Sequence, residues 1–178
     1  MLVGEDSMCR KVPIFVIAIH FTAASAVAHA ANDSVLEKSK RDEIARVADS
    51  DADMKAAFRR ARATLKEFLA LARSPRPTIT SYAVKIGIPD RDEMEYFWIS
   101  QFTQTNGRIV GRLANTPRIV RNVREGERIS FKETDIVDWL YRENGKMVGN
   151  FTACALIKKE TPQQAEAFKR EYGLNCEP

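Results

Sequence analysis

Two Asn-Gly dipeptides constrain the fold of this chain more than any other feature of its sequence. One stands in NGRIVG at 106–111 and the other in NGKMVG at 144–149, and each is flanked by alternating apolar runs. A type I′ turn needs positive φ at both central residues, which Asn and Gly tolerate best. The sequence therefore predicts two antiparallel hairpins. Neither copy is expected to lead into a helix, so neither is interpreted as a phosphate-binding loop.

The hairpin turns also predict which residues oppose one another across the strands. Each turn is followed by a basic residue, an apolar pair and a glycine. A glycine at such a site lets a large side chain or another backbone lie close over the strand. Counting back across the two turns gives the expected pairs Thr105–Arg108, Phe102–Gly111, Glu143–Lys146, Tyr141–Val148, Leu140–Gly149 and Trp139–Asn150.

Two helices are expected to flank the strands. Apolar residues at helical spacing run from Met54 to Ala72, after a capping pair of Ser50 and Asp53, and the SPRP sequence at 74–77 ends this amphipathic helix. A second helix is expected to begin at Pro162, with Thr161 as its cap and Gln164 completing a capping box. Residues 146–159 are interpreted as one strand. We therefore predict that residues 49–178 form one α+β domain, an antiparallel sheet of about five strands packed by an N-terminal and a C-terminal helix.

The first 30 residues have the features of a secretory signal peptide. Two basic residues precede an apolar run at 12–27, and Ala28-His29-Ala30 matches the small-x-small pattern of a cleavage site. Cleavage is expected after Ala30, and Met8 is an alternative start. The mature chain would begin with a polar arm at 31–48 and would be periplasmic or secreted, without stable membrane insertion. A retained N-terminal anchor is the alternative interpretation.

Cleavage at this point would remove both histidines of the chain, His20 and His29. The mature protein would then lack Ser-His-Asp and Cys-His machinery and histidine-ligated zinc. We found no catalytic motif and expect neither a metal nor a cofactor, so the sequence argues against an enzyme. In an oxidising compartment, Cys154 and Cys176 are expected to form a disulfide that ties the C-terminal helix to a strand.

The second hairpin carries the candidate site. Strand alternation places Trp139 and Tyr141 on one face beside Asn150 and Thr152. This mixture of aromatic and amide groups, with Trp98 extending it, is typical of a surface that contacts a polar ligand or a protein. The alternative is that the aromatic residues belong to a core.

The opposite face of this hairpin is apolar except for one carboxylate, Asp138. Two interpretations are open. Asp138 could be a general acid or ligand anchor, or it could accept hydrogen bonds from backbone N–H groups of a nearby turn or helix start.

Several of these motifs together resemble a known family. The sequences DMKAAFRRARATLKEF, YFWIS, GERISF, DIVDWLY and GKMVGNFT, which lie between residues 51 and 159, are similar to the YegJ-like family, a bacterial domain of unknown function. The most specific part is the combination of Asp138-Trp139 with the GKMVGNFT segment. The resemblance implies one compact domain, and it carries no established activity or catalytic residues.

Three hypotheses of function follow. The first is a non-catalytic module that binds an envelope protein or polymer through the hairpin face. The second is a carboxylate-dependent envelope hydrolase that pairs Asp138 with Glu133 or Glu95. The third is an immunity-type protein. A nucleic-acid partner is not expected, because the net charge is only +4 and the basic residues are dispersed.

Overall fold

A six-stranded antiparallel sheet in the order β4-β3-β2-β1-β5-β6 organises the structure. The computed structural model describes residues 34–40 and 51–176, all within one compact unit. The predicted signal peptide at 1–30, its cleavage point after Ala30 and the alternative start at Met8 lie outside the described residues. The strands are β1 (Ile79–Asp90), β2 (Glu93–Thr105), β3 (Arg108–Leu113), β4 (Arg128–Lys132), β5 (Ile136–Glu143) and β6 (Lys146–Gly149).

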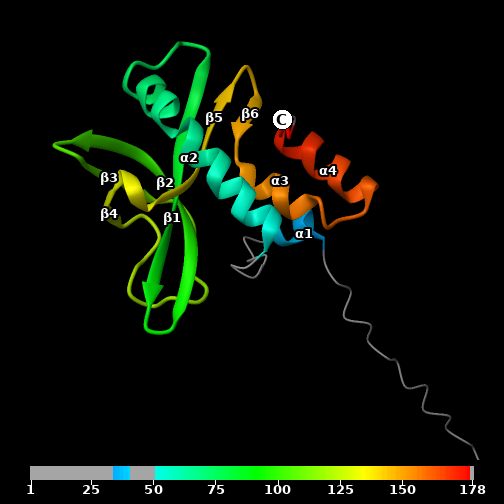
Figure 1. The fold of residues 1–178 in the computed structure, drawn as a ribbon, viewed down its shortest axis with the longest axis horizontal. Helices are drawn as coiled ribbons and strands as arrows, with labels where there is room; N and C mark the ends of the chain where they lie inside the picture. The colour runs from blue at the N-terminus through cyan, green and yellow to red at the C-terminus, as the bar shows by residue number, and fades with distance from the viewer. Residues whose placement is uncertain (1–33, 41–50, 177–178) are drawn as a thin grey trace, which may run out of the picture. The chain divides into compact units, whose positions relative to one another are not determined.

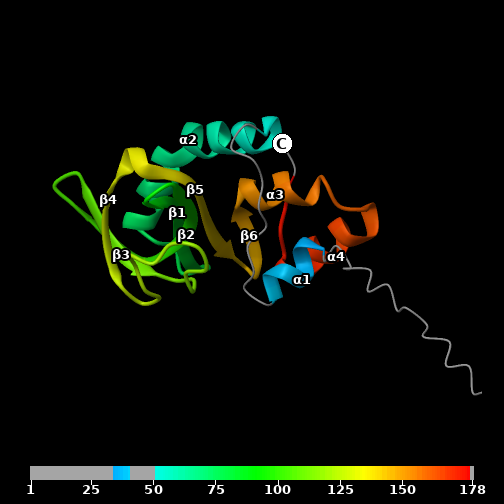
Figure 2. The same cartoon turned by 90° about the horizontal axis from the view of Figure 1, so that it is seen from below.

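Three of the four α-helices that the structure describes gather at one end of the sheet (Figures 1 and 2). The four are α1 (Val35–Lys40), α2 (Ala52–Arg73), α3 (Phe151–Ile157) and α4 (Pro162–Tyr172), and a 3₁₀ turn, η1 (Glu133–Asp135), precedes β5. Figures 1 and 2 show α1, α3 and α4 together at the β6 end, away from β3 and β4, while α2 crosses from the strands to α3. The α+β class is confirmed, with six strands where about five were expected.

The part of the polar arm that the structure describes contains the helix α1, which the sequence did not predict. Its Val35 and Leu36 pack against an apolar cluster that includes Met147 and Phe168. The backbone N–H of Val35 also donates to the Glu160 carboxylate at 3.2 Å. Residues 31–33 and 41–48 of the predicted arm lie outside the described residues.

Both Asn-Gly turns have the predicted conformation. Asn106 and Gly107 have φ of 51° and 77°, and Asn144 and Gly145 have φ of 52° and 78°. The predicted pairs Thr105–Arg108, Glu143–Lys146, Tyr141–Val148 and Leu140–Gly149 are confirmed.

The predicted pair Phe102–Gly111 is wrong, because the β2–β3 register shifts between Ser100 and Thr103. Gln101, inside that shift, has a left-handed backbone with φ of 48°. The close approach at the glycine is nevertheless present, since a Cβ on Gly111 would lie 2.8 Å from the Phe102 Cβ.

The strand predicted over 146–159 is also wrong beyond Gly149. Gly149 and Asn150 both have left-handed backbones, with φ of 84° and 53°, and α3 begins at the next residue. The Asn150 side chain does not cap α3. The free N–H groups at the start of α3 donate instead to Asp138 on β5, a partner that local sequence does not reveal.

The two expected helices are present. The N-cap of α2 is Asp51, whose carboxylate accepts from the Met54 N–H at 2.9 Å, and the other expected capping residue, Ser50, lies outside the described residues. Thr161 and Gln164 form the predicted capping box of α4. The helix α4 packs against α1 and α3, and its Phe168 belongs to the same apolar cluster as Met147 of β6.

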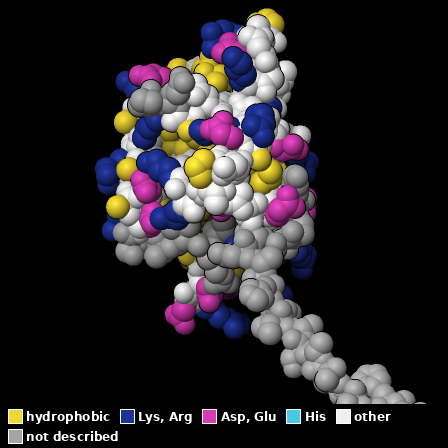
Figure 3. Space-filling view, turned by 90° about the vertical axis from the view of Figure 1, so that its right-hand side faces the viewer, with side chains coloured by type: hydrophobic (Ala, Val, Ile, Leu, Met, Phe, Trp, Pro, Cys, Tyr) yellow, Lys and Arg dark blue, Asp and Glu magenta, His cyan; other side chains and the backbone are white. Residues whose placement is uncertain are grey.

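The expected disulfide Cys154–Cys176 is present, with its Cα atoms 5.6 Å apart. Cys154 had been expected in a strand but lies in α3. The bond therefore links the helix α3 to the C-terminal residues. Figure 3 shows the side of the molecule to the right in Figure 1, on which acidic and basic side chains alternate with scattered hydrophobic ones.

Candidate functional site

A groove of about 460 Å³ lies between α2 and the β5–β6 hairpin. Its apolar lining comprises Phe68, Leu71, Trp139, Tyr141, Val148, Gly149 and Phe151. Its polar lining comprises Arg60, Thr64, Glu67 and Asn175. The volume falls within the range of about 300–1,000 Å³ that is usual for ligand sites. Two of the five residues of the predicted binding face, Trp139 and Tyr141, therefore line a real depression.

Trp139 forms the base of this groove and belongs to the core. The residue is 6% exposed, and its ring stacks on Phe68, with centroids 4.8 Å apart and planes 17° apart. Its indole N–H donates to the Ala61 carbonyl of α2 at 3.0 Å. Phe151 meets the ring edge-on at 5.3 Å. Trp139 therefore fixes α2 on β5, which corrects the interpretation of its ring as an open contact surface.

Gly149 is required by the position of the Trp139 ring. A Cβ at this glycine would clash with the Trp139 carbonyl oxygen and would lie 2.6 Å from a carbon of the Trp139 ring. No side chain fits here, and the φ of 84° favours glycine independently. The sequence predicted that Leu140 opposite, or another backbone, would lie close over Gly149, whereas the structure places the ring and carbonyl oxygen of Trp139 there.

Tyr141 and Phe151 form the accessible aromatic walls of the groove. Both are half-buried, and the Tyr141 ring lies nearly parallel to Trp139 with centroids 6.0 Å apart. The Arg60 guanidinium lies 4.6 Å from the centre of the Phe151 ring, a cation–π contact at the rim. Glu67 lies two turns along α2 from Arg60, so the rim carries both signs of charge.

The other three residues of the predicted face are not in this wall. Asn150 and Thr152 are buried at the start of α3, where the chain has left the sheet. Trp98 lies in a different cross-strand row, because its register partner on β1 is Lys85. Trp139 instead pairs with Val84. The predicted five-residue face is therefore wrong as a single surface, because it assumed that β6 continued through Thr152.

Asp138 is fully buried and accepts four hydrogen bonds. One carboxylate oxygen accepts from the N–H groups of Trp139 at 2.8 Å and Phe151 at 3.2 Å. The other oxygen accepts from the N–H and the hydroxyl of Thr152 at 2.8 and 2.7 Å. This is the arrangement of the second interpretation, a carboxylate that satisfies a helix start. Asp138 thus joins β5 to α3.

Lys85, which sequence reasoning missed, completes this network. Its ammonium donates to the Thr152 hydroxyl at 2.6 Å and lies 4.4 Å from the centre of the Trp98 ring. Burial raises the pKa of Asp138, and the Lys85 charge opposes that rise. Burial likewise lowers the pKa of Lys85, and Asp138 opposes that change. The only signal in the sequence was a lysine inside the otherwise apolar run YAVKIGI.

The two carboxylates that the hydrolase hypothesis paired with Asp138, those of Glu95 and Glu133, accept hydrogen bonds from separate segments of the chain. Glu95 is buried and accepts from three successive backbone N–H groups, those of residues 118–120, at 2.8–3.2 Å. It therefore orders the loop between β3 and β4. Glu133 is exposed in η1 and accepts from Gln104 at 3.5 Å. Within residues 34–40 and 51–176, no cluster of His, Cys, Asp and Glu could hold a metal ion.

Among the helices that the structure describes, none is both long and apolar enough to cross a membrane. This finding concerns residues 34–40 and 51–176 alone.

The chain was compared with known proteins. The family model for "Uncharacterized protein conserved in bacteria (DUF2314)" matches residues 51–176. The uncharacterized protein YegJ of Escherichia coli is 34% identical over 89 residues, which cover 50% of this chain and 58% of YegJ. A Neisseria meningitidis protein described as "Putative ankyrin repeat protein" is 29% identical over 86 residues, covering 48% of this chain and 34% of that protein.

The match spans less than two thirds of the length of each of these relatives. No solved structure matches the chain. The family model, in contrast, covers both hairpins, α2, α3, α4 and the whole groove. The resemblance to the YegJ-like family is thereby confirmed, and the chain belongs to the DUF2314 family of uncharacterized bacterial proteins.

Proposed function

We propose that this domain is a non-catalytic binding module that takes an apolar side chain of a protein partner into the groove between α2 and β5–β6. The observation that carries the proposal is the composition of the groove. Its walls are the aromatic rings of Tyr141 and Phe151, and its rim carries Arg60 and Glu67. Aromatic and arginine residues around a desolvated pocket are the usual energetic centre of a protein interface.

The base of the groove is pre-organised, which favours binding. Trp139 is held by the Phe68 stack and by the hydrogen bond to Ala61, and Gly149 lets it lie flat on β6. On binding, the partner would therefore lose conformational entropy, while the side chains at the base of the groove would lose little. A segment with one large apolar residue between charged neighbours would match the aromatic walls and the mixed-charge rim.

An envelope partner is proposed from the features that point to export. The apolar run at 12–27 followed by Ala28-His29-Ala30 supports a cleaved signal peptide. The disulfide Cys154–Cys176 supports an oxidising compartment, where such bonds persist. The mature domain would then meet its partner in the periplasm or outside the cell.

The proposal is tested by site-specific photo-crosslinking in cells that express the full chain. A photoreactive phenylalanine analogue replaces Tyr141 in the groove or, as a matched control, Tyr96, which is 39% exposed on β2 outside the groove. We expect the probe at position 141 to form an adduct whose attachment maps to a large apolar residue of one partner segment. The probe at 96 is expected not to form it. Equal labelling from both positions, or adducts scattered over many proteins, would contradict the proposal.

A further inference from the structure

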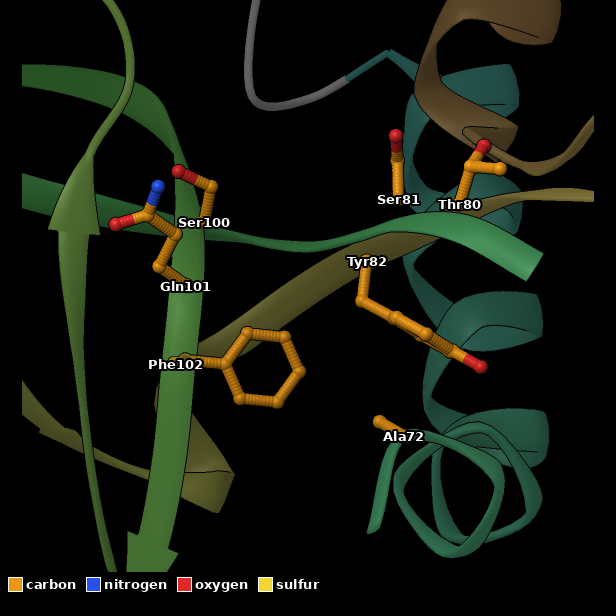
Figure 4. A pocket seen from close by; sticks show the side chains of 7 residues that line it. All are labelled: Ala72, Thr80, Ser81, Tyr82, Ser100, Gln101 and Phe102. Atoms are coloured by element: carbon orange, nitrogen blue, oxygen red, sulfur yellow. The ribbon is translucent and has the colours of Figure 1, made fainter. Parts of the chain in front are cut away.

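The end of the sheet that carries β4 forms an outer ribbon of three strands. Pairing between β1 and β2 ends at Ala83 and Ser100, and beyond this point β2 continues beside β3 alone. Figure 4 shows the two strands diverging, with Phe102 on one and Tyr82 on the other. The outer ribbon therefore consists of residues 100–105 of β2 with β3 and β4, and β4 is its edge strand. Figures 1 and 2 show this edge away from α1, α3 and α4.

One face of the outer ribbon carries four exposed cations. Arg108 stands opposite Lys132, and Arg112 stands opposite Arg128. Strand alternation places all four side chains on the same face, which we call the cationic face. Its other residues are uncharged: Ser100, Thr103, Thr105, Val110 and Ser130. Like charges directly opposite one another destabilise a sheet, so the fold retains this arrangement at a cost in stability.

The two arginines of β3 extend toward the edge strand. The Arg108 Nε donates to the Ser130 hydroxyl at 3.1 Å, which places its guanidinium over β4. Arg112 donates to the Gly126 carbonyl, just before β4, at 3.1 Å. Within residues 34–40 and 51–176, none of the four cations forms an ion pair. Their charge is therefore available to an anionic group placed beside β4.

The backbone of β4 alternates between bonds to β3 and an outward direction. The N–H of Leu113 donates to the carbonyl of Glu127, just before β4, at 2.9 Å. Bonded and unbonded pairs alternate along an antiparallel ladder, so the next residues of β4 that bond to β3 are Ile129 and Phe131. The N–H and C=O groups of residues 128, 130 and 132 consequently point away from β3.

This outward edge is open at Arg128 and Ser130. At the third position, the N–H of Lys132 donates to the Asp135 carboxylate at 2.8 Å, as expected for a group that points away from β3. In the part of the chain that the structure describes, no residue bonds to the outward N–H groups of Arg128 and Ser130. An exposed strand edge of this kind pairs readily with another extended chain.

The charge of the edge determines which chain can pair with it. If two copies of β4 paired antiparallel about Ser130, Arg128 of each copy would face Lys132 of the other, so self-association is disfavoured. An extended segment with a carboxylate at every second position would instead place its acidic groups on the cationic face. Its remaining side chains would lie beside Ile129, which is half-buried on the opposite face and suits β-branched neighbours.

We propose that β4 binds an extended segment of a protein partner, in which acidic and apolar residues alternate, as an added edge strand. The backbone of this segment would bond to the outward groups of Arg128 and Ser130. Its carboxylates would meet Arg108, Arg128 and Lys132 on the cationic face. A polyanion without a peptide backbone would use the charges and leave the strand edge unpaired. This surface is separate from the groove of the proposed function, and neither proposal depends on the other.

The test is an NMR titration of the full chain with the blocked peptide Glu-Val-Glu-Val-Glu, which matches the five residues of β4. We expect saturable shifts of the amide signals of residues 128–132. Hydrogen exchange at the N–H groups of Arg128 and Ser130 should slow when the peptide is bound, because these groups become bonded. The peptide Lys-Val-Lys-Val-Lys reverses the charge and should not bind. Methylating the peptide nitrogens that face β4 keeps the charge but removes donors, and should weaken binding at least about tenfold.

Substitutions in the protein test the edge and the charges separately. Ser130→Pro removes an outward N–H that the ladder with β3 does not use, and it should abolish binding. Ser130→Ala keeps this N–H and should bind within about twofold of the unchanged protein. Replacing Arg108 and Arg128 together with Gln should weaken binding at least about fivefold. The matched control replaces Arg59 and Arg62 with Gln, since both are exposed on α2, and should leave the affinity unchanged.

Three results would overturn the proposal: no saturable shift with the acidic peptide, equal binding of the methylated peptide, or unchanged binding by the folded Ser130→Pro variant. If that variant does not fold, the exchange measurement on the unchanged protein decides, because fast exchange at Arg128 and Ser130 under saturating peptide excludes an added strand. Vesicles of phosphatidylglycerol are the remaining comparison. Shifts at residues 128–132 with these vesicles but not with the peptide would overturn the proposal and assign the cationic face to a membrane surface.

Discussion

Replacing Asp138 with Asn should destabilise the junction between β5 and α3 by more than the small chemical change suggests. Each carboxylate oxygen accepts two hydrogen bonds, and all four donors are N–H or O–H groups of Trp139, Phe151 and Thr152. An amide keeps one oxygen but turns an NH₂ group toward the other two donors. Two bonds are then lost, and Lys85 loses its buried counter-charge.

The magnitude follows from these losses. Two hydrogen bonds to a buried charge contribute about 1.5 kcal/mol each, giving about 3 kcal/mol. Lys85 and Asp138 are joined through the Thr152 hydroxyl, and removing one of two such buried opposite charges costs up to about 3–5 kcal/mol, the cost of a broken buried ion pair. We therefore expect the free energy of unfolding to fall by about 3–5 kcal/mol, a large part of the roughly 5–15 kcal/mol that holds a typical domain together.

The assay is equilibrium unfolding in urea at neutral pH, followed by tryptophan fluorescence and by circular dichroism. The matched control is Asp53→Asn, which removes an exposed ion pair with Lys158 at 2.8 Å. An exposed pair contributes about 0–1 kcal/mol, so this control should unfold almost as the unchanged protein does. If Asp138→Asn loses less than about 1 kcal/mol, the network does not hold α3 in place and the reasoning is refuted.

Three further changes test other parts of the account by the same unfolding measurement. Tyr82→Phe should add about 1 kcal/mol, because the buried Tyr82 hydroxyl has no hydrogen-bond partner among the described residues; a loss of stability would reveal a partner. Burial also raises the pKa of Tyr82 above 10.0, so the unfolded chain releases this proton first. The stability of the unchanged protein should therefore fall more steeply than that of Tyr82→Phe as the pH rises through 10. Gly149→Ala should cost at least about 3 kcal/mol, whereas Gly107→Ala, which has open space and only an unfavourable φ, should cost about 1 kcal/mol; equal losses would contradict the close packing on Trp139. Replacing both Cys154 and Cys176 with Ala should cost about 2–4 kcal/mol, and an unchanged midpoint would show that the bond does not stabilise the fold.

The elements set by local chemistry could be predicted from the sequence. Asn-Gly turns specify positive φ at two adjacent residues, so both hairpins and most of their register followed from the dipeptides alone. The α4 helix followed from its Thr161–Gln164 capping box. The disulfide followed from an even pair of cysteines and the predicted compartment.

The elements set by distant partners could not be predicted in this way. The start of α3 is capped by Asp138, 13 and 14 residues before the N–H groups that it accepts, and residues 150–157 have no cap of their own. The alternating pattern of β6 therefore seemed to continue through Thr152. That single error placed Asn150 and Thr152 on a face beside Trp139.

The groove could not be predicted from the sequence for a related reason. Five of its eleven lining residues, including Arg60, Glu67 and Phe68, come from α2, and the strand pattern says nothing about where α2 crosses the sheet. The sequence showed that Trp139 and Tyr141 are neighbours on one strand face. Only the packing against Ala61 and Phe68 shows that Trp139 is the base and Tyr141 a wall.

The most direct test of the central claim is the affinity of the crosslinked partner segment, as a synthetic peptide, for the unchanged protein and for two single variants. Tyr141→Ser removes an aromatic wall of the groove, and Tyr96→Ser makes the same change outside it. If the groove is the contact surface, Tyr141→Ser should weaken the peptide at least about tenfold, with its fold verified by circular dichroism. Tyr96→Ser should stay within about twofold. An unchanged affinity in the folded Tyr141→Ser variant would contradict the account.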